Sequence, residues 1–260
     1  WDEMVAYGKA VLRKDAAGKV TRWGVGIPGN VGSSQWLFGA LAAQNGASLF
    51  KEDGTQTFLS DPKVVEALQF WVDLSKVHGI HPPGIQEWGT TPADFLEGRI
   101  AMIWTTTGNL TNIKRSAGFD FGVAPYPGKV KPASVLGGGN FYIFSKASAA
   151  EKEAAFRFVK FMTSDELLAD WSVQTGYVAP RDNAWETPTL KKYVEEMPAA
   201  TVARKQIASS VPEFSTYENA RTTKVLNDAL GAALTGAKTP QVALTDAQAE
   251  IDRILKPYRK

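Results

Sequence analysis

Residues 97–127 constrain this chain more than any other stretch. An apolar run from Ile100 to Trp104 predicts a strand, which leads into three threonines and a glycine before a helix that starts near Asn109. A second strand is predicted over Phe119–Val123. The first N–H groups of a helix have no partner within it, so a strand that ends in small hydroxyl residues at a helix start forms a polar crevice. The stretch therefore predicts a binding place for a polar or anionic small molecule in an α/β protein.

Helix and strand signals alternate along the rest of the chain. Before residues 62–77, Asp61 supplies an N-cap and Pro62 a first-turn proline, and apolar side chains follow at helical spacing. Similar signals predict a strand over 23–27 and helices over 1–12, 36–44, 91–97, 148–162, from 164, 187–196, 215–235 and 240–256. No long block of strands interrupts the alternation, which indicates the α/β class with a mainly parallel sheet.

Composition excludes several classes of function. The net charge of +2 on 260 residues is too balanced to suggest nucleic acid or an anionic membrane as partner. The chain has no cysteine, which excludes disulfides and thiolate metal sites, and no apolar run approaches the ~20 residues of a membrane span. His78 and His81 lie in a Gly- and Pro-rich stretch without neighbouring ligands. No metal and no cofactor is therefore expected.

A set of short motifs carries a resemblance to a known family. They are Trp1-Asp2-Glu3-Met4 and the segments 95–102, 106–113, 136–139, 175–180 and 235–244. In order and spacing they resemble the family 1 extracellular solute-binding proteins of bacterial ABC importers, which include maltose-binding protein, and above all the periplasmic members that bind glycerol 3-phosphate. The resemblance implies a type II periplasmic binding protein fold, with two lobes and mainly parallel sheets.

The resemblance also implies an incomplete first lobe. In this family, the segment that resembles residues 1–4 lies well inside the mature protein. Residues 1–138 and 200–260 are accordingly predicted to form the second, C-terminal lobe, and 139–199 a segment of the first, N-terminal lobe. A fragment, a split chain and a permuted chain all agree with this organisation.

The function implied by the resemblance is solute capture. A sugar, a polyol phosphate or a related glycoside would bind between the lobes and pass to the permease subunits of an ABC transporter. A monomer with no nucleic-acid partner is expected, located in the periplasm or anchored by lipid outside the cytoplasmic membrane. The alternative is a glycan-active hydrolase, which needs two carboxylates ~5–9.5 Å apart across a cleft, and no such pair stands out in the sequence.

Five candidate ligand-binding residues lie at predicted helix starts. Trp36 can stack on the apolar face of a sugar or glycerol unit, although a core tryptophan fits its position equally well and only the resemblance favours the site. The other four, which can hydrogen-bond hydroxyl or phosphate groups, are Thr106, Thr107, Gly108 and Asn109. Helix capping by Thr107 or Asn109 is the simpler explanation, and it is compatible with ligand binding.

Four further candidates complete the predicted site. Gly137 and Gly138 belong to a triple glycine whose backbone could approach a ligand at a hinge, or could form a bulge or loop with positive φ. Tyr177 could donate its hydroxyl to a phosphate or sugar oxygen, or pack on the surface of its lobe. Arg221 could face two oxygens of an anionic group, although a solvated arginine on a helix is the simpler reading.

Overall fold

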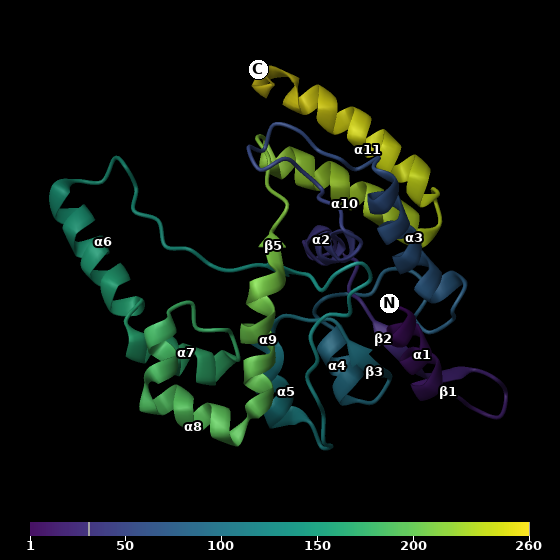
Figure 1. Ribbon diagram of the computed structural model, residues 1–260, viewed down its shortest axis with the longest axis horizontal. Coiled ribbons are helices and arrows are strands. Elements are labelled where there is room, and N and C mark those ends of the chain that lie inside the picture. The colour runs from purple at the N-terminus through teal and green to yellow at the C-terminus, as the bar shows by residue number, and fades with distance from the viewer. Residues whose placement is uncertain (31, 260) are drawn as a thin grey trace. The chain divides into compact units, whose positions relative to one another are not determined.

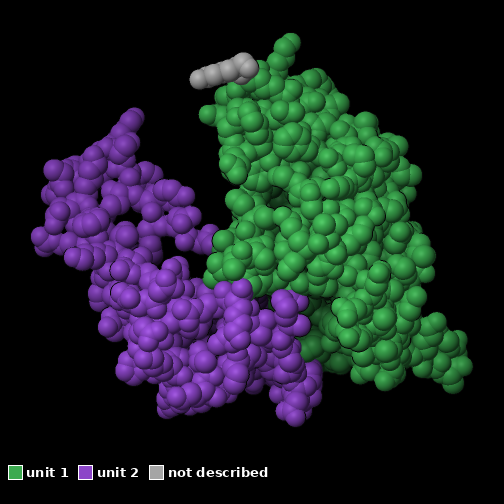
Figure 2. Space-filling view, in the orientation of Figure 1, with its two compact units in different colours: residues 1–105, 126–137, 206–260 green, residues 106–125, 138–205 purple. Residues whose placement is uncertain are grey.

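The computed structural model describes residues 1–30 and 32–259 (Figure 1). The chain divides into two compact units, coloured separately in Figure 2. Unit 1 contains residues 1–105, 126–137 and 206–260, and unit 2 contains residues 106–125 and 138–205. Unit 2 thus combines the predicted 139–199 segment with 106–125, 138 and 200–205. The lobe to which each unit belongs stays a prediction.

Two small sheets lie in unit 1. In the first, β2 (Val20–Gly26) pairs antiparallel with β1 (Arg13–Lys14) and parallel with β3 (Ile100–Ile103), with Trp23 opposite Ile100. In the second, β4 (Ser134–Leu136) runs parallel to β5 (Ser210–Pro212). Parallel strands that lie far apart in sequence are characteristic of the predicted α/β class, which the structure confirms.

Six α-helices and two short 3-10 segments of the described chain lie in unit 1 with these strands. Within the described residues they are α1 (Asp2–Val11), α2 (Ser34–Gln44), α3 (Pro62–Lys76), α4 (Thr91–Leu96), α10 (Asn219–Thr235), α11 (Pro240–Leu255) and η5 (Lys256–Tyr258), with η4 (Ile207–Ser209) before β5. The side chain of Asp61 accepts a hydrogen bond of 2.8 Å from the Lys63 N–H and so caps α3, as predicted. Helix α2 is buried along most of its length, which explains why its sequence is apolar on every face. Its Phe38 and Leu41 pack in one core with Trp71 of α3.

One buried histidine organises the loop that follows α3. His81 is 3% exposed, and its Nδ1 lies 2.7 Å from the carbonyl oxygen of Pro82. The Ile27 N–H donates to His81 Nε2 over 3.0 Å. A neutral ring with its proton on Nδ1 satisfies both contacts. Burial lowers the pKa of His81, which favours the same neutral form.

Unit 2 is mainly helical. Its elements are η1 (Thr107–Asn109), α5 (Leu110–Ser116), α6 (Ala149–Met162), α7 (Asp165–Thr175), η2 (Asp182–Glu186), α8 (Pro188–Glu196), η3 (Pro198–Ala200) and most of α9 (Thr201–Gln206). A small core joins α5, α7 and α8 through Leu110, Ala169 and Leu190, with Trp185 beside them. Each of the long helices predicted from the sequence is present, with its ends within a few residues of the expected ones.

The predicted strand over Phe119–Val123 is wrong. Neither sheet of the described chain includes these residues, which have no regular secondary structure. Phe121 and Val123 are partly buried and pack on the small core of unit 2. Their alternating apolar side chains therefore reflect packing on helices.

In the described part of the chain, no helix is both long and apolar enough to cross a membrane.

Candidate functional site

The predicted crevice at residues 106–109 is a half-buried turn in unit 2. Thr106 caps η1, because its hydroxyl oxygen accepts a hydrogen bond of 3.3 Å from the Gly108 N–H. The hydroxyl of Thr107 has no hydrogen-bond partner among the described residues and lies beside this cap. Asn109 ends η1, and α5 begins at Leu110. Capping by Thr107 or Asn109 is therefore a wrong prediction, because Thr106 caps η1 and the side chain of Asn109 makes no capping hydrogen bond to α5.

Tyr177 lies directly against this turn. A Cβ atom placed on Gly108 would come within 2.5 Å of Cζ of the Tyr177 ring, so only glycine leaves room for the ring. Gly176 ends α7 with φ of +96°, and a Cβ there would lie 2.5 Å from the carbonyl oxygen of Thr107. The Tyr177 side chain is 41% exposed. The structure therefore brings together two predicted site residues, Gly108 and Tyr177, that are far apart in sequence.

A second group of predicted residues lies in unit 1. Trp36, in the first turn of α2, meets Gly137 so closely that a Cβ on Gly137 would be 3.4 Å from Trp36 Nε1. The ring of Trp88 contacts Trp36 edge-on, with centroids 5.7 Å apart. Asn30 fixes this contact from both sides, since its Oδ1 accepts from the Trp88 N–H at 3.0 Å and from the Ser33 hydroxyl at 2.8 Å. Trp36 is thus held from two directions at a helix N-terminus.

Unpaired polar atoms are concentrated at this helix start. Trp36 Nε1 and Gln35 Oε1 are buried and have no hydrogen-bond partner among the described residues. A buried donor or acceptor left without a partner costs about 1–3 kcal/mol, so such atoms call for an explanation. The backbone at Gly137 lies close to this N–H, since a Cβ added there would be 3.4 Å from Trp36 Nε1.

The two remaining candidates are less constrained. Gly138 has open space where a Cβ would lie. The Arg221 side chain, near the start of α10, is 64% exposed and pairs with Glu218 over 3.6 Å. Its role toward an anionic group stays a prediction. All nine candidates are thus placed, with Trp36, Gly137 and Arg221 in unit 1 and the other six in unit 2.

Sequence reasoning missed three residues around Trp36. Gln35 follows two serines at a helix start, which is a signal that could have singled it out. Asn30 follows a Pro-Gly pair, which indicates a turn and no more. Nothing in the sequence around Trp88 indicates its contact with Trp36. The two residues are 52 positions apart (88 − 36), and only the fold brings them together.

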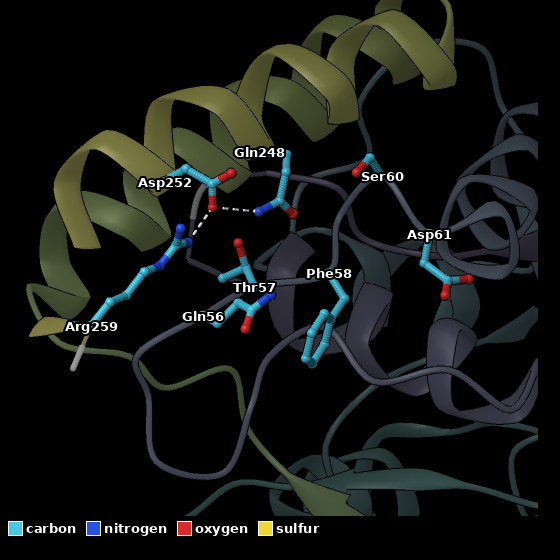
Figure 3. Close-up of a pocket in the computed structure, with 8 residues that line it drawn as sticks. All are labelled: Gln56, Thr57, Phe58, Ser60, Asp61, Gln248, Asp252 and Arg259. Carbon is cyan, nitrogen blue, oxygen red and sulfur yellow. Dashed lines mark hydrogen bonds and ion pairs between the residues drawn. The ribbon is translucent and has the colours of Figure 1, made fainter. Parts of the chain in front are cut away.

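Two of the cavities that the described residues form lie in unit 1, and neither is lined by a predicted site residue. The first, of about 390 Å³, is polar (Figure 3). In its lining, Asp252 accepts hydrogen bonds from Gln248 and Arg259 (Figure 3), and the buried hydroxyl of Thr57 has no partner among the described residues. The second, of about 800 Å³, is lined by the loop 46–54, by Lys131 and by residues 211–217.

Among the described residues, no group of three or more His, Cys, Asp or Glu side chains could hold a metal ion.

Comparisons with known proteins agree with this architecture. Residues 1–199 match the model of a family described as bacterial extracellular solute-binding protein. The sn-glycerol-3-phosphate-binding periplasmic protein UgpB of Pectobacterium atrosepticum is 28% identical over 222 residues, which are 80% of this chain and 49% of that protein. The chain thus spans about half the length of this relative.

Two solved structures show the fold. UgpB from Mycobacterium tuberculosis in complex with glycerophosphocholine superposes with a TM-score of 0.84 at 23% identity, over 99% of this chain and 64% of that one. The maltodextrin-binding domain MalE from Bdellovibrio bacteriovorus bound to maltotriose also gives 0.84, at 22% identity, over 98% of this chain and 66% of that one. Both are type II periplasmic binding proteins, so the predicted fold is confirmed for the part that this chain covers. The chain belongs to the bacterial extracellular solute-binding protein family.

Proposed function

We propose that this chain is part of a substrate-binding protein of a bacterial ABC importer. The protein captures a sugar, a polyol phosphate or a related glycoside outside the cytoplasmic membrane and delivers it to the permease subunits. Family membership supports this role, and so do the ligands named for similar proteins, which include glycerol 3-phosphate, glycerophosphocholine and maltotriose. The proposed activity is binding without turnover, by a monomer that is not an enzyme.

The distribution of the candidate residues over both units carries the proposal. The chain crosses from one unit to the other beside two of the candidate groups, between residues 105 and 106 and between 137 and 138. A solute that binds residues on both units stabilises the arrangement in which it contacts both, and depopulates the others. Such a population shift is a simple way for a binding protein to signal that it is loaded.

The chemistry of the candidates suits a hydroxylated solute. The face of Trp36 stacks on CH groups, while the hydroxyls of Thr107 and Tyr177 bind oxygen atoms. The Trp36 N–H, which is buried and unpaired, gains an acceptor if the glycine segment beside it moves. If the solute is anionic, Arg221 leaves its exposed ion pair with Glu218 and binds two phosphate oxygens of the solute.

Isothermal titration tests the proposal on the protein translated from the whole reading frame that encodes these residues. The panel is glycerol 3-phosphate, glycerophosphocholine and maltotriose, and each solute is afterwards checked for hydrolysis. We expect one solute to bind with micromolar or tighter affinity and to be recovered unchanged. Hydrolysis of the bound solute, which the alternative of a glycan-active hydrolase requires, or failure of every sugar and polyol phosphate to bind, would contradict the proposal.

A further inference from the structure

Helix α2 is capped by a side chain from another helix. Its N-cap residue, Ser33, makes no capping hydrogen bond, because the Ser33 hydroxyl donates to Asn30 Oδ1 instead. The acceptor comes from α10, where Asn227 Oδ1 accepts the Gln35 N–H over 3.3 Å and the Ser34 hydroxyl over 2.7 Å. Gln35 is the second residue of α2, so its N–H is one of those that a helix leaves without a partner. Asn227 therefore does the work of an N-cap residue from 192 positions away in the sequence.

This contact between α10 and α2 is buried and has no substitute. Asn227 is 5% exposed, Ser34 1% and Gln35 6%, so loss of the amide would leave two donors with little access to water. No other side chain of the described residues accepts from either donor. The first turn of α2 also has no acidic residue to favour the positive end of the helix dipole. Since an N–H can only donate, the oxygen of the Asn227 amide, and not its nitrogen, faces α2.

Trp36, the next residue of α2, takes its direction from this first turn. Its ring meets that of Trp88 edge-on, with centroids 5.7 Å apart. Trp88 supports the ring from one side, but the Cα–Cβ bond that aims the ring belongs to the turn that Asn227 holds. Helix α10 also carries the candidate Arg221 near its start. One amide thus joins the helix of Trp36 to the helix of Arg221, both in unit 1.

We propose that Asn227 is a positioning residue for Trp36. Its Oδ1 sets the first turn of α2 and so aims the Trp36 ring at the solute, while its Nδ2 takes no part in this role. The consequence for solute affinity rests on the proposed function, whereas the consequence for the orientation of the ring does not. The two consequences are therefore measured separately.

Three variants of the full-length protein test this role. Asn227→Ala removes the acceptor, Asn227→Asp keeps it, and Asn45→Ala is the matched control. Asn45 lies at the other end of α2, is 2% exposed, and donates to the Lys63 carbonyl oxygen and to Glu66 Oε2, both over 2.8 Å. Its substitution therefore removes a buried amide that ties the same helix to a neighbour, at a distance from Trp36.

The first measurement is isothermal titration with the solute of the panel that binds best. We expect Asn227→Ala to bind about fivefold more weakly than the wild type, or worse, and both Asn227→Asp and Asn45→Ala to stay within about twofold of it. A carboxylate still accepts from the Gln35 N–H, and its negative charge is favoured at a helix N-terminus.

Three outcomes of the titration would overturn the proposal. Unchanged affinity in Asn227→Ala would show that the solute does not depend on this amide. An equal loss in Asn227→Asp would show that Nδ2 binds the solute directly. An equal loss in Asn45→Ala would show that affinity follows the stability of α2 alone.

The second measurement, near-ultraviolet circular dichroism, needs no solute. The difference between each protein and its Trp36→Phe counterpart isolates the signal of Trp36 and of its contact with Trp88. Asn227→Asp should keep this difference spectrum, and Asn227→Ala should lose most of it. If Asn227→Ala does not fold, Asn227→Ser replaces it, because the serine hydroxyl lies one bond closer to the backbone and falls short of α2.

The spectrum separates this proposal from the proposed function. An unchanged difference spectrum in the alanine or serine variant would overturn the positioning role, whatever the affinities are. A lost spectrum together with failure of every solute to bind the wild type would support the positioning of Trp36 and contradict the proposed function only.

Discussion

Substitution of Gly176 by alanine should disrupt the turn that carries the candidate site in unit 2. Gly176 ends α7 in the left-handed conformation, with φ of +96°. A side chain in that region costs about 1–2 kcal/mol. The new Cβ would also lie 2.5 Å from the carbonyl oxygen of Thr107 and 2.6 Å from Cβ of Leu110, and overpacking of this kind costs about 1–3 kcal/mol more. We expect Gly176→Ala to destabilise unit 2 by about 2–5 kcal/mol.

Gly236 provides the matched control. It ends α10 in the same left-handed conformation, with φ of +80°, but the atom nearest to a new Cβ is Nζ of Lys76 at 3.5 Å. Gly236→Ala should therefore destabilise unit 1 by only about 1 kcal/mol. The left-handed conformation disfavours alanine, and this cost is partly offset because alanine has less conformational freedom than glycine in the unfolded chain.

The assay is urea unfolding followed by amide hydrogen exchange, which assigns the loss of stability to a unit. Amides of α7 and α8 report on unit 2, and those of α3 and α11 report on unit 1. Gly176→Ala should weaken the first set, and Gly236→Ala should slightly weaken the second. If Gly176→Ala costs no more than Gly236→Ala, the close contact between residues 176 and 107 does not exist in solution and the reasoning is refuted.

Because burial lowers the pKa of His81, the unfolded chain binds the proton first, and the stabilisation present above about pH 6.5 should be lost as the pH falls below that value. His81→Gln should flatten the pH dependence of the urea midpoint, and an unchanged pH dependence would contradict the role of His81. Trp71→Ala empties a site that is 1% exposed and should cost about 3–5 kcal/mol in unit 1, and a cost below 1 kcal/mol would contradict the packing. Thr107→Val combined with Gly138→Trp should weaken solute binding by the full-length protein more than tenfold with little change in melting temperature, measured by titration and calorimetry, and unchanged affinity would discard the site.

The sequence was sufficient for most of the helices because their signals are local. Ser148 with Glu151 and Asp61 with Pro62 mark helix starts within a few residues, and the structure contains both caps. The alternation of helices and strands also led to the correct fold class. Predictions that depend on one turn of chain could therefore be made from residues alone.

Features that depend on distant partners could not be predicted in this way. Residues 119–123 alternate like a strand, but whether a strand forms is decided by a neighbouring strand, and Phe121 packs on helices instead. The contact of Trp88 with Trp36 and the approach of Tyr177 to Gly108 both join segments that are far apart in sequence. The sequence alone predicted the polar residue types at the turn, whereas the residues that contact the turn could be identified only from the folded structure.

The most direct test of solute capture by both units is one titration series on the full-length protein. The solute that binds best is titrated into the wild type, Trp36→Ala and Thr107→Val, which alter one candidate residue in each unit. We expect each substitution to weaken binding about tenfold or more, since each removes a contact worth roughly 1–2 kcal/mol. Full affinity in either variant would show that the solute is held by one unit alone, or elsewhere, and would contradict the account.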